Sequence, residues 1–425
     1  MASSTSDPAA GKRIVLHIGL HKTGTTYLQH ALQANAAELR AQGVYVPVGR
    51  NEPRLLRAVD DLHGRRQVKA DNARIDGAWS RLVTRVLDVE QPTVLLSDER
   101  LSLSSVGAIG KIKRSFEGCE LRVVVTVRDP ARVVVSSWEE AIRGGGTWRW
   151  PDYVDAVSSP ERRGANPARA FWARQDLARI TAAWEALVAN DAIYVVTVPQ
   201  RSGSPRALLE RFADAVGFDP GPLTREPRRA NTAIGPAGTE VVRRLNESLA
   251  GRLDRRRYDD VVKYAIAPHL SAAAAAAPAP AVADDAWLRE MAEAQIRTLS
   301  ARGYRIVGDL DDLRPAVPAG AQPGTPGEAE LLDAAMEALV GLALKHAESA
   351  GSRPGQAAPG TASSDGGSRL RRLAFAGRRA VLRAADEGGV LEPAVALAYR
   401  AREARQEHAM HAARRRRRRS RSDPG

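Results

Sequence analysis

The segment RIVLHIGLHKTGTT, residues 13–26, constrains the fold more than any other part of the sequence. An apolar run typical of a buried strand leads into a turn that contains Gly19 and Gly24, and a helix is predicted from Thr25 to about Ala34. Amide groups of such a turn and of the first helical turn converge on one point, where the helix dipole also favours negative charge. The segment therefore predicts a site for an anion such as phosphate.

Further apolar runs predict more buried strands, at residues 44–46, 93–97, 121–127 and 193–198. Helical patterns separate or follow them, and the main predicted helices are 77–89, 131–142, 168–189, 205–216, 236–249, 255–266 and 284–301. Continuous apolar strands alternating with helices are typical of a parallel sheet covered on both faces. We therefore predict an α/β fold with a doubly wound parallel sheet, similar to the P-loop NTPase fold. Residues 304–310 are predicted as a turn that ends this domain.

A chain of 425 residues with 44% apolar residues can bury a sizeable core. Residues 13–314 are predicted to form one domain, preceded by a disordered segment 1–12. A Pro/Gly/Ala-rich linker with one helix at 329–349 is predicted for residues 315–368, and a basic helical, Arg-rich tail for residues 369–425.

The net charge of +13 is concentrated in the tail, where residues 369–425 contain 16 arginines against 6 acidic residues. The rest of the chain is only slightly positive, which argues against a nucleic-acid-binding core. The tail ends in an arginine run, Arg414–Arg421, that could attract nucleic acid or an anionic membrane surface; the alternative is a solvated, disordered tail.

Targeting and redox signals in the sequence are few. The single cysteine, Cys119, cannot form an intrachain disulfide and fits a reducing compartment. Neither a signal peptide nor a long apolar segment is predicted. A cytoplasmic location is therefore expected.

A second anion-binding feature is predicted at the end of the strand 121–127. Arg128 follows this strand directly, and Ser136 lies eight residues later in the predicted helix. A guanidinium and a hydroxyl placed in this way can hold one phosphate together, at the same sheet edge as the first turn. Taken alone, Arg128 could instead pair with Asp129 or a helix end, with Ser136 facing solvent.

These two features resemble the motifs of sulfotransferases that use 3′-phosphoadenosine 5′-phosphosulfate (PAPS), and bacterial members in particular. The turn KTGTT, residues 22–26, is similar to the motif that holds the 5′-phosphosulfate, and the pair Arg128 and Ser136 is similar to the motif for the 3′-phosphate. The resemblance spans residues 13 to about 315. It implies transfer of a sulfuryl group from PAPS to an acceptor hydroxyl, in a carbohydrate, lipid or small metabolite, without a metal ion.

The resemblance also implies roles for individual residues of the turn. Lys22 would stabilise negative charge on the leaving phosphate oxygen. Thr23, Gly24, Thr25 and Thr26 would hold the 5′-phosphate, mainly through the amides of the last three.

The general base that must take the acceptor's proton is less well defined. Glu99, just past the strand 93–97, is the first candidate, and Asp98 and His63 are alternatives; Glu99 could instead cap a helix or pair with Arg100. A histidine pair that some bacterial relatives carry is absent from the comparable region at residues 51–54, so the acceptor class stays open.

A rival interpretation is an NTP-dependent phosphotransferase, because residues 94–99 also resemble a Walker B strand. A Walker A loop places lysine directly after its second glycine, where this chain has Thr25. Sulfuryl transfer is therefore favoured over phosphoryl transfer. The acceptor pocket is expected within residues 50–75, 143–167 and 225–270, and neither the acceptor nor the oligomeric state follows from the sequence.

Overall fold

The computed structural model describes most of the chain up to residue 351. The described ranges are 11–49, 52–65, 72–159, 166–186, 188–200, 206–226, 233–273, 286–315 and 326–351. The predicted basic tail, with its run Arg414–Arg421, and most of the predicted N-terminal segment 1–12 lie outside these residues.

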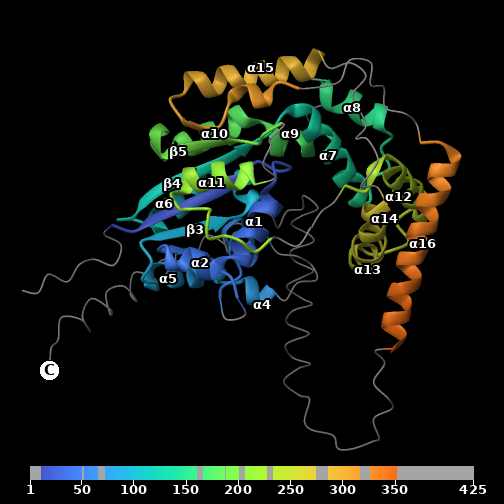
Figure 1. Cartoon of the computed structure of the whole chain (residues 1–425), viewed down its shortest axis with the longest axis horizontal. Helices are drawn as coiled ribbons and strands as arrows, with labels where there is room; N and C mark the ends of the chain where they lie inside the picture. Colours follow the sequence, from blue (N-terminus) through green and yellow to red (C-terminus); the bar gives the residue numbers. More distant parts are fainter. Residues whose placement is uncertain are drawn as a thin grey trace, which may run out of the picture.

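A single parallel sheet forms the centre of the described structure, with strand order β2-β3-β1-β4-β5-β6 (Figure 1). The strands are β1 (Arg13–Gly19), β2 (Val44–Tyr45), β3 (Thr93–Ser97), β4 (Glu120–Val127), β5 (Ile193–Thr197) and β6 (Arg305–Val307). After β1 the chain builds β2 and β3 on one side, and it then crosses to β4 on the other side. This change of direction places a topological switch point beside β1, where open α/β sheets bind ligands.

Alternate residues of the central strand β1 face opposite layers of helices. Ile14, Leu16 and Ile18 lie in one buried cluster, whereas Val15 lies in the other. Successive side chains of a strand point to opposite faces of the sheet. Both faces of β1 are therefore covered by apolar groups, which confirms the predicted doubly wound α/β fold.

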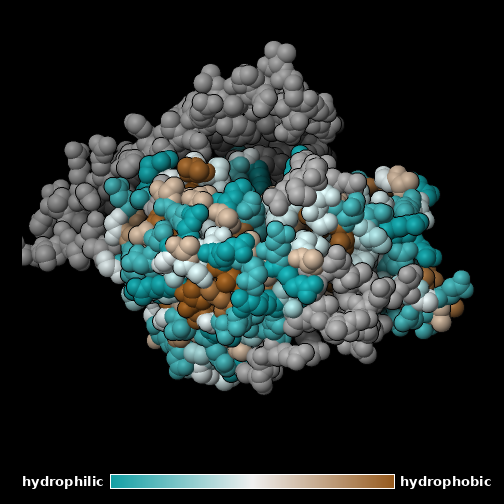
Figure 2. All heavy atoms as spheres, turned by 90° about the horizontal axis from the view of Figure 1, so that it is seen from above, coloured by the Kyte–Doolittle hydropathy of each residue, from teal (hydrophilic) through white to brown (hydrophobic). Residues whose placement is uncertain are grey.

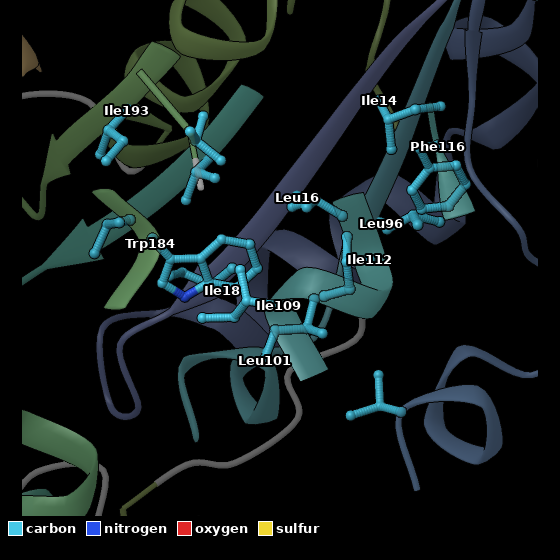
Figure 3. Packing of buried hydrophobic residues seen from close by; sticks show 14 of the residues in the cluster. Ile14, Leu16, Ile18, Leu96, Leu101, Ile109, Ile112, Phe116, Trp184 and Ile193 are labelled. Atoms are coloured by element: carbon cyan, nitrogen blue, oxygen red, sulfur yellow. The ribbon is translucent and has the colours of Figure 1, made fainter. Parts of the chain in front are cut away.

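The first face packs against helices α3, α5, α6, α10 and α15. Their bounds are α3 (Leu55–Leu62), α5 (Ala78–Asp88), α6 (Val106–Ser115), α10 (Leu177–Glu185) and α15 (Ala286–Ala301). Figure 3 shows Leu16, Ile18 and Leu96 of the strands against Ile109 and Trp184 of the helices. Fully burying an aliphatic side chain of this size contributes roughly 1.5–3 kcal/mol, so this layer is a major source of stability.

The second face packs against α1 (Thr25–Ala34), α2 (Ala36–Ala41) and α11 (Ala207–Val216). Leu28 and Leu32 of α1 and Phe212 of α11 are buried there. Because α1 is anchored in this way, the turn that precedes it is held at the carboxyl edge of the sheet.

A third cluster lies beyond the sheet and consists of helices only. It includes α7 (Pro130–Arg143), α8 (Trp150–Ser158), α9 (Ala168–Gln175), α12 (Gly235–Leu249), α13 (Arg255–Val261), the π-helical turn η4 (Val262–Ile266), α14 (Ala267–Ala273) and α16 (Glu328–Gly351). Figure 1 shows α12, α13, α14 and α16 side by side, away from the strands. The sequence predicts a helix at 329–349 inside a linker; in the structure Ala334 and Ala338 of α16 pack into this cluster.

Two predicted elements differ in the structure. The predicted helix 168–189 is divided into α9 and α10 at Asp176, whose side chain accepts a hydrogen bond from the backbone amide of Arg179 and so begins a new helix. Residues 305–307 of the predicted turn 304–310 form the strand β6 at the edge of the sheet. The helices α3, α6 and α8 and the short α4 (Asn72–Ile75) have no counterpart among the predicted elements.

The surface of the described part is mainly polar in Figure 2, with apolar residues in small patches. Large exposed apolar side chains recur along α16, at Leu332, Met336, Leu339, Val340 and Leu344. Within the described ranges, no helix has both the length and the apolar character needed to cross a bilayer.

Candidate anion-binding site

The turn after β1 lies at the carboxyl edge of the sheet, between β3 and β4. The amide of Leu20 donates to the carbonyl of Thr126 on β4 (2.7 Å), and the amide of Asp98, after β3, donates to the carbonyl of His17 (3.0 Å). Gly24 begins α1 with a φ of 85°, in the left-handed region that glycine favours. A Cβ atom at Gly24 would come within 2.6 Å of the Leu208 side chain. The predicted strand, turn and helix are therefore all present.

Thr23 stabilises the turn from inside the protein. Its fully buried hydroxyl donates to the carbonyl of Leu20 (2.6 Å) and is hydrogen-bonded to the hydroxyl of Thr126 (2.6 Å). Thr126 continues the network to His17 (3.3 Å), which in turn contacts Ser97 (2.7 Å). Because the Thr23 hydroxyl is already hydrogen-bonded within the fold, any contact between Thr23 and a bound anion has to come from its backbone.

Lys22 has an unusual backbone conformation for a residue with a side chain, with a φ of 66°. Such left-handed conformations are costly and cluster at functional sites. Its ammonium group lies 3.1 Å from a carboxylate oxygen of Glu140 on α7. Its carbonyl accepts a hydrogen bond from the guanidinium of Arg128 (3.3 Å). Lys22 and Arg128, which are distant in the sequence, are thus neighbours in space.

Arg128 directs its guanidinium at the turn, not at Asp129. Asp129 pairs instead with Arg132 and caps α7. The Arg128 Nε atom is buried and has no hydrogen-bonding partner among the described residues. Burial, together with repulsion from Arg132, lowers the pKa of Arg128 to about 10, although Asp129 acts in the opposite direction. A buried and incompletely paired cation is costly unless an anion can reach it, so its presence marks a candidate anion site.

Ser136 lies in the middle of α7 and is partly buried. No described residue is hydrogen-bonded to its hydroxyl, so the structure does not join it directly to Arg128. Ser136 and Glu140 are four residues apart and therefore share one face of the helix. Because Glu140 contacts Lys22, this face of α7 is directed at the glycine turn.

The three candidate bases have different environments. The carboxylate of Asp98 receives hydrogen bonds from the backbone amide and the guanidinium of Arg100, the shortest at 2.6 Å. His63 is hydrogen-bonded to Ser104 (2.8 Å), and burial is the main cause that lowers its pKa to about 4. Asp98 and His63 are thus engaged in structural contacts.

Glu99 lies beside the turn, as its position after β3 predicts. A Cβ atom added at Gly19 would stand 2.9 Å from the Cβ atom of Glu99. The Glu99 carboxylate accepts a hydrogen bond from the side-chain amide of Gln29 on α1 (3.0 Å). Of the three candidates, Glu99 alone combines a position at the turn with a carboxylate that no cation neutralises in the contacts described.

Several residues around Lys22 escaped the sequence interpretation. His21 is largely buried, its Nε2 atom has no partner among the described residues, and its pKa is lowered to about 4, first by burial and then by Arg174. Gln175 donates to the carbonyl of His21 (2.8 Å). Glu140 was the residue most open to prediction, because it lies one helical turn beyond Ser136.

The site contains cations and backbone amides but no cluster of metal ligands. In the part of the chain that the structure describes, no group of three or more His, Cys, Asp or Glu side chains could hold a metal ion.

Comparisons with known proteins add little to this picture. No protein-family profile matches the chain, and no curated protein matches its sequence. Among solved structures, a sulfotransferase from Alicyclobacillus acidocaldarius is similar with a TM-score of 0.34 and 12% identity, over 57% of this chain and 97% of that protein. So low a TM-score carries no argument about fold or activity, which depend here on the strand order and on the contacts described above.

Proposed function

We propose that the chain is a sulfotransferase that moves a sulfuryl group from PAPS to an acceptor hydroxyl. The observation that carries the proposal is the meeting of Lys22 and Arg128 at the glycine turn, with the Arg128 Nε atom buried and unpaired among the described residues. PAPS presents two separate anionic ends. The turn and Lys22 fit its 5′-phosphosulfate, and Arg128, with Ser136 on the following helix, fits its 3′-phosphate.

In this proposal the chain's residues act by positioning and by electrostatic stabilisation. Amides of Gly24, Thr25 and Thr26 hold the 5′-phosphate at the start of α1. The acceptor oxygen attacks sulfur in line with the bond that breaks, and the leaving phosphate oxygen keeps the electron pair of that bond. Lys22 stabilises the charge that develops on this oxygen.

The rival NTP-dependent phosphotransferase fits the site less well. Asp98 stands where a Walker B acid would help to hold magnesium, but Arg100 already binds its carboxylate. Thr25 occupies the position of the Walker lysine and is buried. Both features weigh against magnesium–nucleotide chemistry at this turn.

Calorimetry tests the donor class before any acceptor is known. We expect 3′-phosphoadenosine 5′-phosphate (PAP), the product nucleotide, to bind more tightly than ATP with magnesium. Tighter binding of ATP with magnesium, or no binding of PAP, would contradict the proposal.

A binding role for the tail stays a separate proposal. Removal of residues 369–425 should leave sulfuryl transfer to a small acceptor intact if the tail is a separate interaction segment. Loss of all turnover in the truncated chain would instead tie the tail to catalysis.

A further inference from the structure

The contact between Lys22 and Glu140 is not explained by donor binding. Glu140 has a half-exposed side chain on α7, and its carboxylate oxygen lies 3.1 Å from the Lys22 ammonium group. A carboxylate at this position repels the phosphosulfate that Lys22 is proposed to bind. If the Glu140 carboxylate has no other role, its only effect is to lower the affinity for the phosphosulfate. We therefore expect a second role.

Other carboxylates near the turn are less suited to proton transfer. The Asp98 carboxylate accepts three hydrogen bonds from Arg100, and one oxygen of Glu99 accepts the Gln29 amide, whereas the contact described for Glu140 is with the Lys22 ammonium group. Glu140 is the carboxylate that touches the proposed catalytic lysine. Because Ser136 lies one turn before it on the same helix face, Glu140 is also aligned with the proposed donor site.

We propose that Glu140, in place of Glu99, is the general base of the reaction; this inference rests on the proposed function. The acceptor O–H gives its proton to the Glu140 carboxylate while the acceptor oxygen bonds to sulfur. The bond between sulfur and the bridging phosphate oxygen breaks, and that oxygen leaves with the electron pair as part of PAP. The Glu140 carboxylic acid then returns its proton to solvent.

The distance between the two side chains suits this division of work. An in-line transfer places the attacking and leaving oxygens on opposite sides of sulfur. A base and its proton donor lie about 2.6–3.2 Å apart, and a cation contacts the leaving oxygen over a similar distance. The 3.1 Å contact places a base and a cation side by side, so that each could contact one of these two oxygens of a sulfuryl group bound beside them.

The electrostatic surroundings keep Glu140 ionised at neutral pH. Burial alone would raise its pKa, but the Lys22 ammonium, with smaller effects of His21 and Arg174, holds the pKa below its ordinary value. Tyr153 on α8 is a further titratable group facing this cluster, and burial raises its pKa, so it is neutral there. The base form is thus available without a change of protonation.

The test compares three glutamine variants of the full chain. Glu140→Gln removes the proposed base, and Glu99→Gln removes the alternative base. Glu247→Gln is a matched control, because Glu247 has a similarly half-exposed side chain and pairs with a cation, Arg243, on α12. For each protein we would measure PAP binding by calorimetry and single-turnover transfer of radiolabelled sulfuryl from PAPS to water, a hexose and a phenol.

We expect Glu140→Gln to bind PAP as tightly as the parent or more tightly, because Lys22 loses a competing anion. Transfer should slow by at least about 100-fold, the scale of general-base catalysis. The parent rate should fall as the pH is lowered through the pKa of the base, and this acidic limb should disappear in Glu140→Gln. The control Glu247→Gln should keep both the rate and the pH profile, and Glu99→Gln should keep the acidic limb of the profile.

Several results would overturn the inference. Parental transfer by Glu140→Gln would reduce Glu140 to a counter-ion of Lys22, and a selective loss in Glu99→Gln would restore Glu99 as the base. An acidic limb that persists unchanged in Glu140→Gln would also contradict it, because that limb would then belong to another group. Failure of the parent to bind PAP would refute the proposed function itself, so the two failures are distinguishable.

Discussion

Two groups of charges lie at the carboxyl edge of the same sheet, and they differ in how they are paired. After β3, Arg100 bridges Asp98 and Asp60 at 2.6 and 2.8 Å, and the three side chains are largely buried. Beside β1 and β4, the partly buried guanidinium of Arg128 contacts a carbonyl, and its buried Nε atom has no partner among the described residues. Charges that are mutually paired can hold a fold together, whereas a largely buried cation without a direct ion pair marks a candidate anion site.

The largest expected effect is on the rate of transfer, and it concerns Lys22, the cation proposed to stabilise the leaving oxygen. Lys22→Ala should lower the rate of sulfuryl transfer about 100- to 1,000-fold, as for removal of one oxyanion-stabilising donor. Single-turnover assays measure this loss. Lys113→Ala, which removes an exposed lysine of α6, is the control and should keep the parental rate. An active Lys22→Ala protein would contradict the role assigned to the turn.

The paired group should matter for stability instead. Arg100→Ala leaves Asp98 and Asp60 without their cation, and breaking a buried pair of this kind costs about 3 kcal/mol of unfolding free energy. Urea unfolding measures the change, and PAP binding by the folded protein should persist. The control is Arg13→Ala, which removes a more exposed pair with Glu120 and should cost less than about 1 kcal/mol. Equal losses of unfolding free energy in the two variants would show that the bridge after β3 stabilises the fold no more than an exposed ion pair does.

Arg128→Ala should show the reverse pattern. We expect PAP binding to weaken by about 1.5–3 kcal/mol, the scale of hydrogen bonds to a charged group. Unfolding free energy should change little, because the variant also removes a cation that is buried without a counter-ion. Calorimetry and urea unfolding on the same preparation provide both values. Unchanged PAP affinity would refute the assignment of Arg128 to the 3′-phosphate.

The smallest effect concerns His17, which lies between the two groups. Its ring is hydrogen-bonded to Ser97, directly before Asp98, and to Thr126, two residues before Arg128. Burial lowers its pKa to about 3, whereas the unfolded chain binds a proton at this residue below about pH 6.5. Stability should therefore fall as the pH is lowered from about 6.5 toward 3. By pH 5 His17 should have lowered the free energy of unfolding by about 2 kcal/mol relative to neutral pH.

The measurement for His17 is urea unfolding at pH 7.5 and pH 5. His17→Asn should lose stability at neutral pH, but it should show a smaller further loss on acidification than the parent. Some pH dependence should remain, because burial lowers the pKa of His21 and His63 in the same direction. An unchanged pH dependence would show that His17 titrates normally in the folded protein.

Local patterns were enough to predict the elements that carry the site. The helix after the turn was predicted from Thr25 to about Ala34 and is α1 (Thr25–Ala34), and the strand 93–97 is β3 (Thr93–Ser97). Strong apolar runs and glycine turns act over short distances, so they can be read without the fold. The break at Asp176 was missed because one capping residue interrupts an otherwise continuous amphipathic pattern, and β6 was missed because it has three residues and begins with Arg305.

Candidate site residues were predicted by type and spacing, but their pairing was not. The contact of Arg128 with the Lys22 carbonyl, the bridge from Arg100 to Asp60 and the approach of Glu140 to Lys22 each join segments that are separate in the sequence. These contacts depend on the angles at which α7 and the segment after β3 leave the sheet.

The amino-acid sequence by itself determined the alternation of strands and helices and the glycine turn, because backbone conformation and apolar periodicity are local properties. Tertiary structure alone decided which charges form ion pairs and which are left without one. The reason is physical: the energy of a charge depends on its burial and on neighbours brought close by folding, and neither is a property of a residue's position along the chain.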